Sequence, residues 1–243
     1  MTEGISLAAE KLGQIGPLPI TNTFVTTWLV TLILIGFAFI ATRKVALIPS
    51  PLQNFAEFLV ESLYNMVQSV AGEKTKVFFP IVASFFFFII VGNYLGLLPG
   101  AGTIGYYEGK HFVPFFRSIN SDLNTTLALA LVSVITTHYL AIKYLGLGAY
   151  LKKWFPLNPI MLFVGLIELA GEFTKVISLS FRLFGNVYAG ESVLDTASHK
   201  LFAFIVPIPF LSLEIIVGFV QALVFSMLTL AFMVLLTEKH EAH

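Results

Sequence analysis

Long hydrophobic runs alternate along the chain with short polar segments. Three runs, 24–41, 77–98 and 125–142, contain no Asp, Glu, Lys or Arg, whereas 160–194 and 201–236 are longer and carry a few charged residues. About 20 apolar residues are needed for a helix to cross roughly 30 Å of hydrocarbon, and lipid offers no partner to an open strand edge. All five runs are therefore predicted to be membrane-embedded helices of an all-α polytopic protein.

The last two runs are too long for an upright crossing. At a rise of about 1.5 Å per residue they would measure about 52 Å and about 54 Å. Steep tilt accommodates such lengths, and Pro207 and Pro209 offer a break that shortens the last helix. We expect two steeply tilted helices lining a curved polar groove.

The link between the first two runs contains a helix of a different kind. Ser50 is a suitable N-cap and Pro51 a suitable first residue for a helix over 51–70. Apolar side chains recur on one face of this helix, and the opposite face carries Glu57 and Glu61 but no Lys. The pattern predicts an amphipathic helix in the cytoplasmic interface, either docked against a protein neighbour or acting as a simple anchor.

The distribution of Lys and Arg predicts the orientation. One side carries eight of them, namely Arg43, Lys44, Lys74, Lys76, Lys143, Lys152, Lys153 and Lys239. The other side carries four, namely Lys11, Lys110, Arg117 and Lys200. Cytoplasmic loops are enriched in positive charge, so five crossings place the N-terminus outside and the C-terminus in the cytoplasm.

The composition agrees with a single membrane domain over residues 1–243. The chain is 57% hydrophobic and 12% charged, and its 14 basic and 14 acidic residues give no basic footprint for nucleic acid. Without Cys it has no disulfide or thiolate metal site, and the tail with His240, Glu241 and His243 is interpreted as solvated. No metal or cofactor is expected.

Polar residues within the fourth run fall on one helical stripe. Five of them lie within roughly 80° of one another at 100° per residue: Glu168, Glu172, Lys175, Arg182 and Asn186. Small residues that permit close helix approach run beside them: Gly171, Ser178, Gly185 and Ala189. Glu191 lies off the stripe and is expected to face a different neighbour.

Arg182 is the charge in this run that its own helix leaves unexplained. Glu168, Glu172 and Lys175 have the spacing of a stabilising ion-pair ladder, but Arg182 has no acid three or four residues away. Its partner must be Glu214 of the last run or a carboxylate on another chain. Because a guanidinium stays protonated, it can fix a charge but cannot relay a proton.

His138 stands apart from these residues in the third run. A hydrogen bond from its ring to a backbone carbonyl is a simpler expectation than a role as a proton relay.

Several segments, in the same order, resemble subunit a of F-type ATP synthases. The segment 178–191, SLSFRLFGNVYAGE, resembles that family's signature. The segments GNYLGLLP at 92–99, SDLNTT at 121–126 and QA at 221–222 agree with it. The resemblance covers nearly the whole chain from the first run onward.

The resemblance implies a non-catalytic, proton-translocating stator subunit. In that family subunit a stands beside a rotating ring of c subunits and provides two aqueous half-channels, which an essential arginine separates. It couples proton flow to ring rotation and ATP synthesis. The implied partners are the c ring, b-type peripheral stalk subunits, the remaining synthase subunits and the lipid bilayer. A bacterial plasma membrane, or alternatively a thylakoid membrane, is the implied location.

Carried over by position, the resemblance assigns site residues. Arg182 is the essential arginine, Glu191 the acid of the outer half-channel with Asn186 beside it, and Gln221 the glutamine near the arginine. Glu214 stands where some members have His. Asp122 and Asn124 fall at the outer mouth of the channel. Glu168, Glu172 and Lys175 fall toward the cytoplasmic exit, where structural pairing remains an equal alternative.

Two other functions compete with this interpretation. An independent polytopic transporter or channel would explain intramembrane charge, but the runs show no inverted repeat. An intramembrane enzyme lacks support, because neither His-Glu-x-x-His nor Gly-x-Ser-x-Gly occurs in the chain.

Overall fold

The chain is an assembly of long helices with two small hairpins. The computed structural model describes residues 9–16, 18–43, 46, 48–98, 104–108, 111–156, 159–200 and 207–238. Its helices are α1 Asn22–Thr42, α2 Pro51–Ala71, α3 Thr75–Leu97, α4 Leu123–Leu145, α5 Leu147–Trp154, α6 Pro159–Lys200 and α7 Pro207–Thr237. Residues 201–206, at the start of the fifth predicted run, and the tail with His240, Glu241 and His243 lie outside the described residues.

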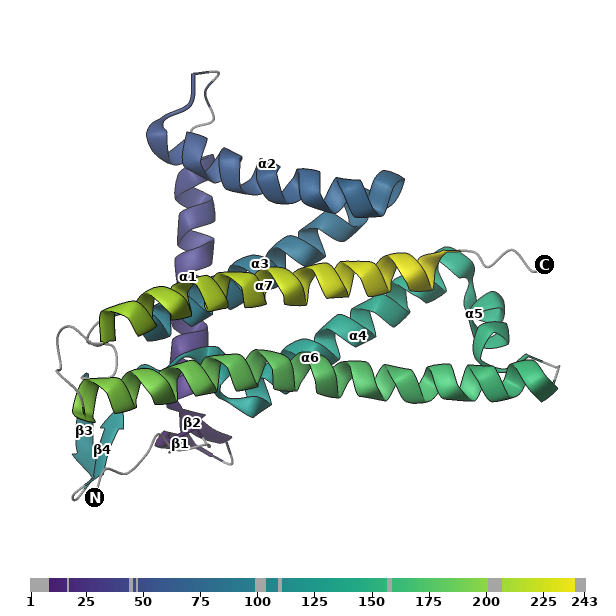
Figure 1. Cartoon of the computed structure of the whole chain (residues 1–243). Helices are drawn as coiled ribbons and strands as arrows, with labels where there is room; N and C mark the ends of the chain where they lie inside the picture. The colour runs from purple at the N-terminus through teal and green to yellow at the C-terminus, as the bar shows by residue number, and fades with distance from the viewer. Residues whose placement is uncertain are drawn as a thin grey trace.

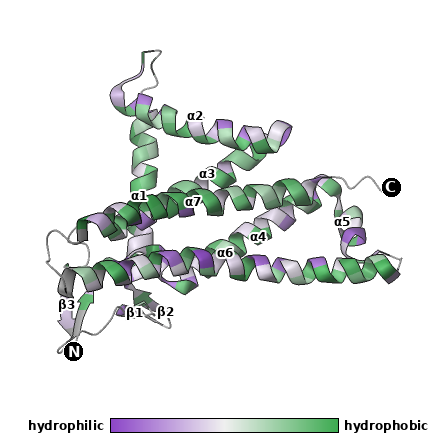
Figure 2. Ribbon diagram, in the orientation of Figure 1, coloured by the Kyte–Doolittle hydropathy of each residue, from purple (hydrophilic) through white to green (hydrophobic). Residues whose placement is uncertain are grey.

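The all-α membrane architecture is confirmed in outline. Four stretches of the described chain are long and apolar enough to cross a membrane: Asn22–Thr42, Pro51–Leu97, Leu123–Leu145 and Ile208–Thr237. α6 is not among them, because its more apolar half carries Glu168, Glu172 and Lys175 and its other half is more polar. Figure 2 shows these hydrophilic positions along α6, whereas α1 is hydrophobic along most of its length. The count of five stays a prediction.

Two antiparallel hairpins were not expected from the sequence. β1 Lys11–Ile15 pairs with β2 Leu18–Thr21, and β3 Gly105–Glu108 pairs with β4 His111–Pro114. Strands of four or five residues leave little hydropathy pattern. The hairpins lie at one end of α1 and α2 lies at the other, so they sit on opposite sides of the helix assembly (Figure 1).

The segment joining α2 to α3 makes a sharp corner. Ser50 caps α2 by accepting from the backbone N–H of Gln53 at 3.3 Å, and Pro51 is the first helical residue. Gly72 adopts a positive φ of 55° at the end of α2, which side chains with a Cβ disfavour. The short 3₁₀ turn η1, Gly72–Lys74, then leads into α3.

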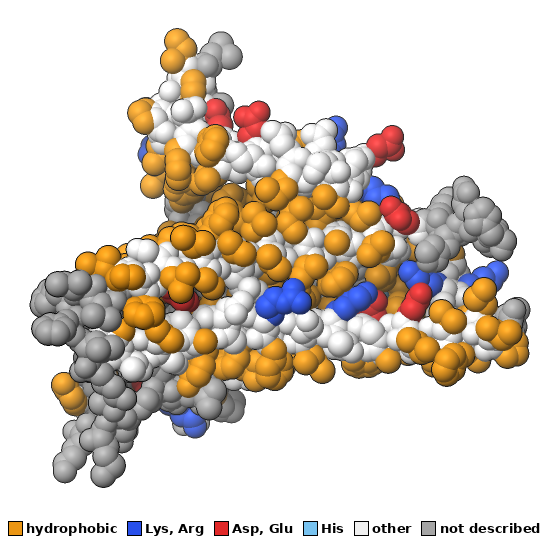
Figure 3. Space-filling view, viewed as in Figure 1, with side chains coloured by type: hydrophobic (Ala, Val, Ile, Leu, Met, Phe, Trp, Pro, Cys, Tyr) orange, Lys and Arg blue, Asp and Glu red, His pale blue; other side chains and the backbone are white. Residues whose placement is uncertain are grey.

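α6 and α7 lie side by side and run crosswise to α1 (Figure 1). α3 packs on α7, and α4 packs on both α6 and α7. The core between these helices also receives Leu63 from α2 and contains Phe85, Phe86, Ile89, Ala130, Leu179, Leu183, Val187, Ala222 and Phe225. Much of the outer surface remains hydrophobic, as suits a protein surrounded by lipid (Figure 3).

Close packing at the end of α3 positions the segment before α4. A Cβ at Gly92 would overlap Ile119 of the 3₁₀ turn η3, Ile119–Ser121. Asn93 accepts a hydrogen bond from Asn120 at 2.7 Å and donates one to the Gly218 carbonyl of α7 at 3.3 Å. The Gly92-Asn93 pair therefore ties α3 to both η3 and α7.

Candidate functional site

Arg182 lies exposed on α6 without an acidic partner among the described side chains. Its Nη2 donates to Ser178 Oγ at 3.2 Å, and no described carboxylate forms an ion pair with it. Glu214 instead packs against Gly190, about two helical turns away. Of the two partners considered from the sequence, Glu214 is therefore ruled out in this structure.

The α6 surface around Arg182 is open and built from small residues. A Cβ added at Gly171 or Gly185 would meet no atom within 4 Å, and Ser178 and Ala189 are exposed. Figure 3 shows Lys and Arg side chains among hydrophobic ones on the face where α6 and α7 lie together. The stripe of small residues thus faces away from this chain's own helices.

Asn186 and Gln221 join α6 to α7 one turn beyond Arg182. Asn186 Nδ2 donates to Gln221 Oε1 at 2.7 Å, and Gln221 is buried. The hydrogen bond brings together two of the residues selected from the sequence and fixes the helix spacing behind the arginine.

Glu191 faces a different neighbour from the stripe. Its Oε2 lies 3.8 Å from Nε of Arg117, and both side chains are largely buried. Arg117 Nε also donates to Ser121 Oγ at 2.8 Å, which holds the guanidinium in place. From the sequence, Arg117 was expected only as one of the outer cations, because no spacing rule connects a loop residue to a residue of a helix 74 positions away.

Glu214 lies close enough to Glu191 for their charges to interact, whereas the ion pair of Arg117 is with Glu191. Glu214 is 7% exposed, and its carboxylate fills the space over Gly190, where a Cβ would overlap it. Two acids therefore converge on the end of α6 that lies beyond Arg182.

Asp122 is the N-cap residue of α4. Its Oδ1 accepts from the backbone N–H of Asn124 at 3.0 Å, and its Oδ2 accepts from Thr23 Oγ1 of α1 at 3.1 Å. Asp122 is buried, whereas Asn124 is exposed. The carboxylate caps α4 and ties it to α1.

Glu172, Lys175 and His138 form a cluster toward the other end of α6. Lys175 Nζ lies 2.7 Å from Glu172 Oε1, and His138 Nε2 lies 3.6 Å from Glu172 Oε2. His138 Nδ1 is 2.9 Å from the Tyr150 hydroxyl of α5. The expectation of a backbone carbonyl partner for His138 was therefore wrong, because α5 folds back against α4. Glu168 is exposed and stays outside this cluster.

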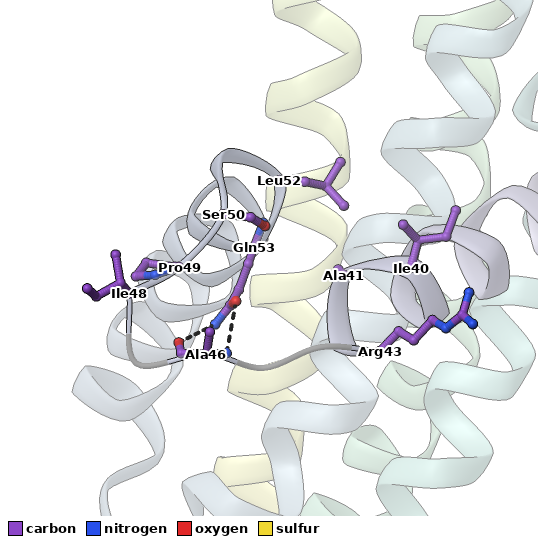
Figure 4. Close-up of a pocket in the computed structure, with 9 residues that line it drawn as sticks. All are labelled: Ile40, Ala41, Arg43, Ala46, Ile48, Pro49, Ser50, Leu52 and Gln53. Atoms are coloured by element: carbon purple, nitrogen blue, oxygen red, sulfur yellow. Dashed lines mark hydrogen bonds between the residues drawn. The ribbon is translucent and has the colours of Figure 1, made fainter.

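A separate surface hollow lies where α1 meets α2 (Figure 4). At its edge the Gln53 side chain pairs with both backbone groups of Ala46, accepting from N–H at 3.3 Å and donating to C=O at 3.2 Å. None of the residues lining the hollow belongs to the stripe around Arg182. The hollow is formed by the end of α1, the linker and the start of α2, and we give it no role in the candidate site.

The described side chains hold no group of three His, Cys, Asp or Glu suited to a metal ion. The candidate site offers carboxylates, one imidazole, amides and fixed cations.

Comparison with known proteins identifies the family. Residues 24–234 match the ATP synthase A chain family. ATP synthase subunit a of Gloeobacter violaceus is 38% identical over 244 residues, which cover 98% of this chain and 94% of the relative. Subunit a of Moorella thermoacetica is 32% identical over 222 residues, covering 91% and 93%. Subunit a 1 of Pelobacter propionicus is 38% identical over 212 residues, covering 85% and 83%. The chain belongs to the ATP synthase A chain family.

Proposed function

We propose that this chain delivers protons to a rotating ring of c subunits and receives them back through two aqueous half-channels, which Arg182 separates. As a member of its family it is the stator proton-channel subunit of an F-type ATP synthase and works with the other synthase subunits. It thereby serves proton transport and ATP synthesis.

The exposure of Arg182 on a face of small residues carries this proposal. A charged side chain facing lipid at mid-membrane costs about 2.5–3.5 kcal/mol even on mild insertion scales. Because the Glu214 carboxylate packs against Gly190 and not against Arg182, the acid that compensates this cost comes from another chain. A ring carboxylate passing along the Gly171 to Ala189 stripe supplies it, and the guanidinium favours the ionised form of that carboxylate.

The two half-channels occupy opposite ends of α6. Glu191 lies nine residues beyond Arg182, and Glu172 lies ten residues before it, so each is about 14–15 Å away along the helix. We assign Glu191, Glu214, Asn186 and Gln221 to the outer half-channel and Glu172, Lys175 and Glu168 to the cytoplasmic one. Asp122 and Asn124 stand at the outer mouth, where Asp122 acts mainly as a helix cap.

Contacts between the ends of helices support the proposed topology of five crossings with the N-terminus outside. Lys74 Nζ donates to the Thr237 carbonyl at 2.9 Å, which joins two segments assigned to the cytoplasm. Thr23 and Asp122, both assigned outside, meet at 3.1 Å. We further propose that α1 stands upright in the membrane. Because α2 lies across one end of α1, and α6 and α7 run crosswise to it (Figure 1), α2 would then be in the cytoplasmic interface and α6 and α7 would be steeply tilted. We place the protein in a bacterial plasma membrane or a thylakoid membrane, with b-type stalk subunits as further partners.

Replacement of Arg182 tests the function. We expect Arg182→Ala to abolish ATP-driven proton pumping by the assembled synthase without reducing the amount of assembled complex. Arg43→Ala, at the exposed end of α1, is the matched control and should pump normally. Coupled pumping at the normal rate in Arg182→Ala would refute the proposal, and proton flux through this chain alone would support an independent channel instead.

The channel assignment has its own test. Glu191→Gln should slow proton flow per assembled complex more than Glu168→Gln, because Glu191 is buried beside Arg117 whereas Glu168 is exposed outside the Glu172 cluster. The reverse order in vesicles containing the whole synthase would mean that the outer path is misplaced.

A further inference from the structure

A titratable cluster joins three helices on the side assigned to the cytoplasm. It consists of His138 from α4, Tyr150 from α5, and Glu172 and Lys175 from α6. The Trp154 ring lies 6.1 Å from the rings of both His138 and Tyr150 and closes the cluster on the α5 side. The resemblance to the family assigned no role to His138 or Tyr150.

Both nitrogens of the His138 ring have partners. Nδ1 lies 2.9 Å from the Tyr150 hydroxyl, and Nε2 lies 3.6 Å from Glu172 Oε2, whose other oxygen is held by Lys175. The hydroxyl can donate to neutral imidazole or accept from imidazolium, and the carboxylate stabilises imidazolium. The ring can therefore exist in either protonation state without losing its partners.

The surroundings of His138 combine opposing charges with access to water. The charged groups that face it are Glu172 and Lys175 from α6 and Lys153 from α5. Its side chain is 23% exposed, against 11% for Glu172. Burial raises the pKa of the Tyr150 phenol, so this group stays a neutral hydroxyl. An imidazole ordinarily titrates near pH 6.5, the range in which a proton can be both taken up and released.

We propose that His138 is the proton-exchanging group between the cytoplasmic half-channel and cytoplasmic water, and that Glu172 and Tyr150 position its ring. During synthesis the neutral ring takes up one proton that has left the c ring, becomes imidazolium beside Glu172, and loses one proton to water. During ATP hydrolysis the same two transfers run in reverse. The inference rests on the half-channel assignment proposed above.

Chemical rescue separates proton exchange from a packing role. The assay uses the whole synthase in inverted membrane vesicles with an uncoupler present. Carbodiimide-sensitive ATP hydrolysis then reports ring rotation, which requires protons that enter through the cytoplasmic half-channel. We expect His138→Ala to lower this rate on the order of 100-fold or more, as is typical when a positioned acid–base group is lost. Imidazole in the medium should restore much of the rate. Pyrazole, which has the same size but is far less basic, should not.

Two further variants keep the inference testable if His138→Ala assembles poorly. His138→Gln retains a polar group toward Tyr150 but cannot be protonated, so its rate should be low and should lack the pH dependence of the parent near neutrality. Ser133→Ala removes the 2.8 Å hydrogen bond between Ser133 and Thr229 that also joins α4 to another helix. It should hydrolyse ATP at the parent rate and ignore imidazole.

The outcomes distinguish this inference from the function it rests on. A normal rate in His138→Gln, or a low rate in His138→Ala that imidazole does not raise, would show that His138 only packs the helices. Either result beside an inactive Arg182→Ala would overturn the His138 assignment alone. Normal coupled activity in Arg182→Ala would overturn the half-channel assignment itself.

Discussion

Asn186 of α6 donates a hydrogen bond to the side-chain oxygen of Gln221 on α7, with 2.7 Å between Nδ2 and Oε1. The bond lies one turn from Arg182, whose own side-chain hydrogen bond goes to Ser178 of α6. It therefore joins α6 to α7 beside the guanidinium. A neighbouring chain that approaches Arg182 meets a backbone whose spacing this amide pair has fixed.

A double-mutant cycle should detect this coupling. Asn186→Ala and Gln221→Ala should each slow ATP-driven proton pumping, and the double variant should be little slower than either one, because a single bond is lost in all three. Side-chain hydrogen bonds between membrane helices average about 0.6 kcal/mol with a maximum near 1.7 kcal/mol, so a coupling in that range is expected. Additive effects of the two substitutions would mean that each residue acts separately.

Hydropathy predicted the long apolar helices well, because lipid requires such segments to satisfy their own backbone. The predicted run 24–41 corresponds to α1 Asn22–Thr42, and 125–142 to α4 Leu123–Leu145. α6, by contrast, extends to Lys200, six residues beyond the predicted end of its run. A helix can continue into polar sequence where no Pro or Gly ends it, and a hydropathy pattern does not detect this continuation.

The site was predictable only as far as one helix determines it. The angular position of Glu191, away from the stripe, follows from helical periodicity. Its contact with Arg117 depends on how α3 and η3 place a loop, and the seating of Glu214 on Gly190 depends on the register between two helices. His138 meets Tyr150 because the short helix α5 turns back after Gly146, which has a φ of 81°. A single-helix pattern contains none of these relationships.

Gly190 should tolerate no side chain while Glu214 is present. A Cβ at this position overlaps the Glu214 carboxylate, and overpacking of a filled site typically costs about 1–3 kcal/mol. Gly190→Ala should therefore reduce the amount of subunit in the membrane or slow proton flow. Glu214→Asp, which withdraws the carboxylate by one methylene, should partly restore Gly190→Ala.

Gly36 of α1 provides the control for this substitution. Nothing lies within 4 Å of a Cβ at Gly36, so Gly36→Ala should leave both readouts unchanged. Equal effects of the Gly36 and Gly190 substitutions, or a failure of Glu214→Asp to improve Gly190→Ala, would contradict the proposed packing.

Asp122 should behave as a helix cap rather than as a proton carrier. Asp122→Asn keeps an oxygen that can accept from the Asn124 N–H, and its amide nitrogen can donate to the Thr23 hydroxyl, so assembly and proton flow should stay near normal. Asp122→Ala removes the cap, at a cost of about 0.5–2 kcal/mol, and should lower the thermal stability of the subunit in the complex. A loss of proton flow in Asp122→Asn as large as in Asp122→Ala would instead identify a titrating group.

The Arg117–Glu191 pair makes the sharpest prediction about assembly. Both side chains are largely buried, and removing one member of a buried ion pair typically costs about 3–5 kcal/mol because it strands the other charge. Arg117→Gln should therefore strongly reduce the subunit recovered in membranes. Glu191→Gln in the same chain removes the stranded carboxylate and should restore recovery, although proton flow should remain impaired. Quantitative immunoblotting of membranes measures recovery independently of pumping. If the double variant is recovered no better than Arg117→Gln alone, the two side chains do not compensate each other's charge, and Arg117 stabilises this end of α6 through Ser121 instead.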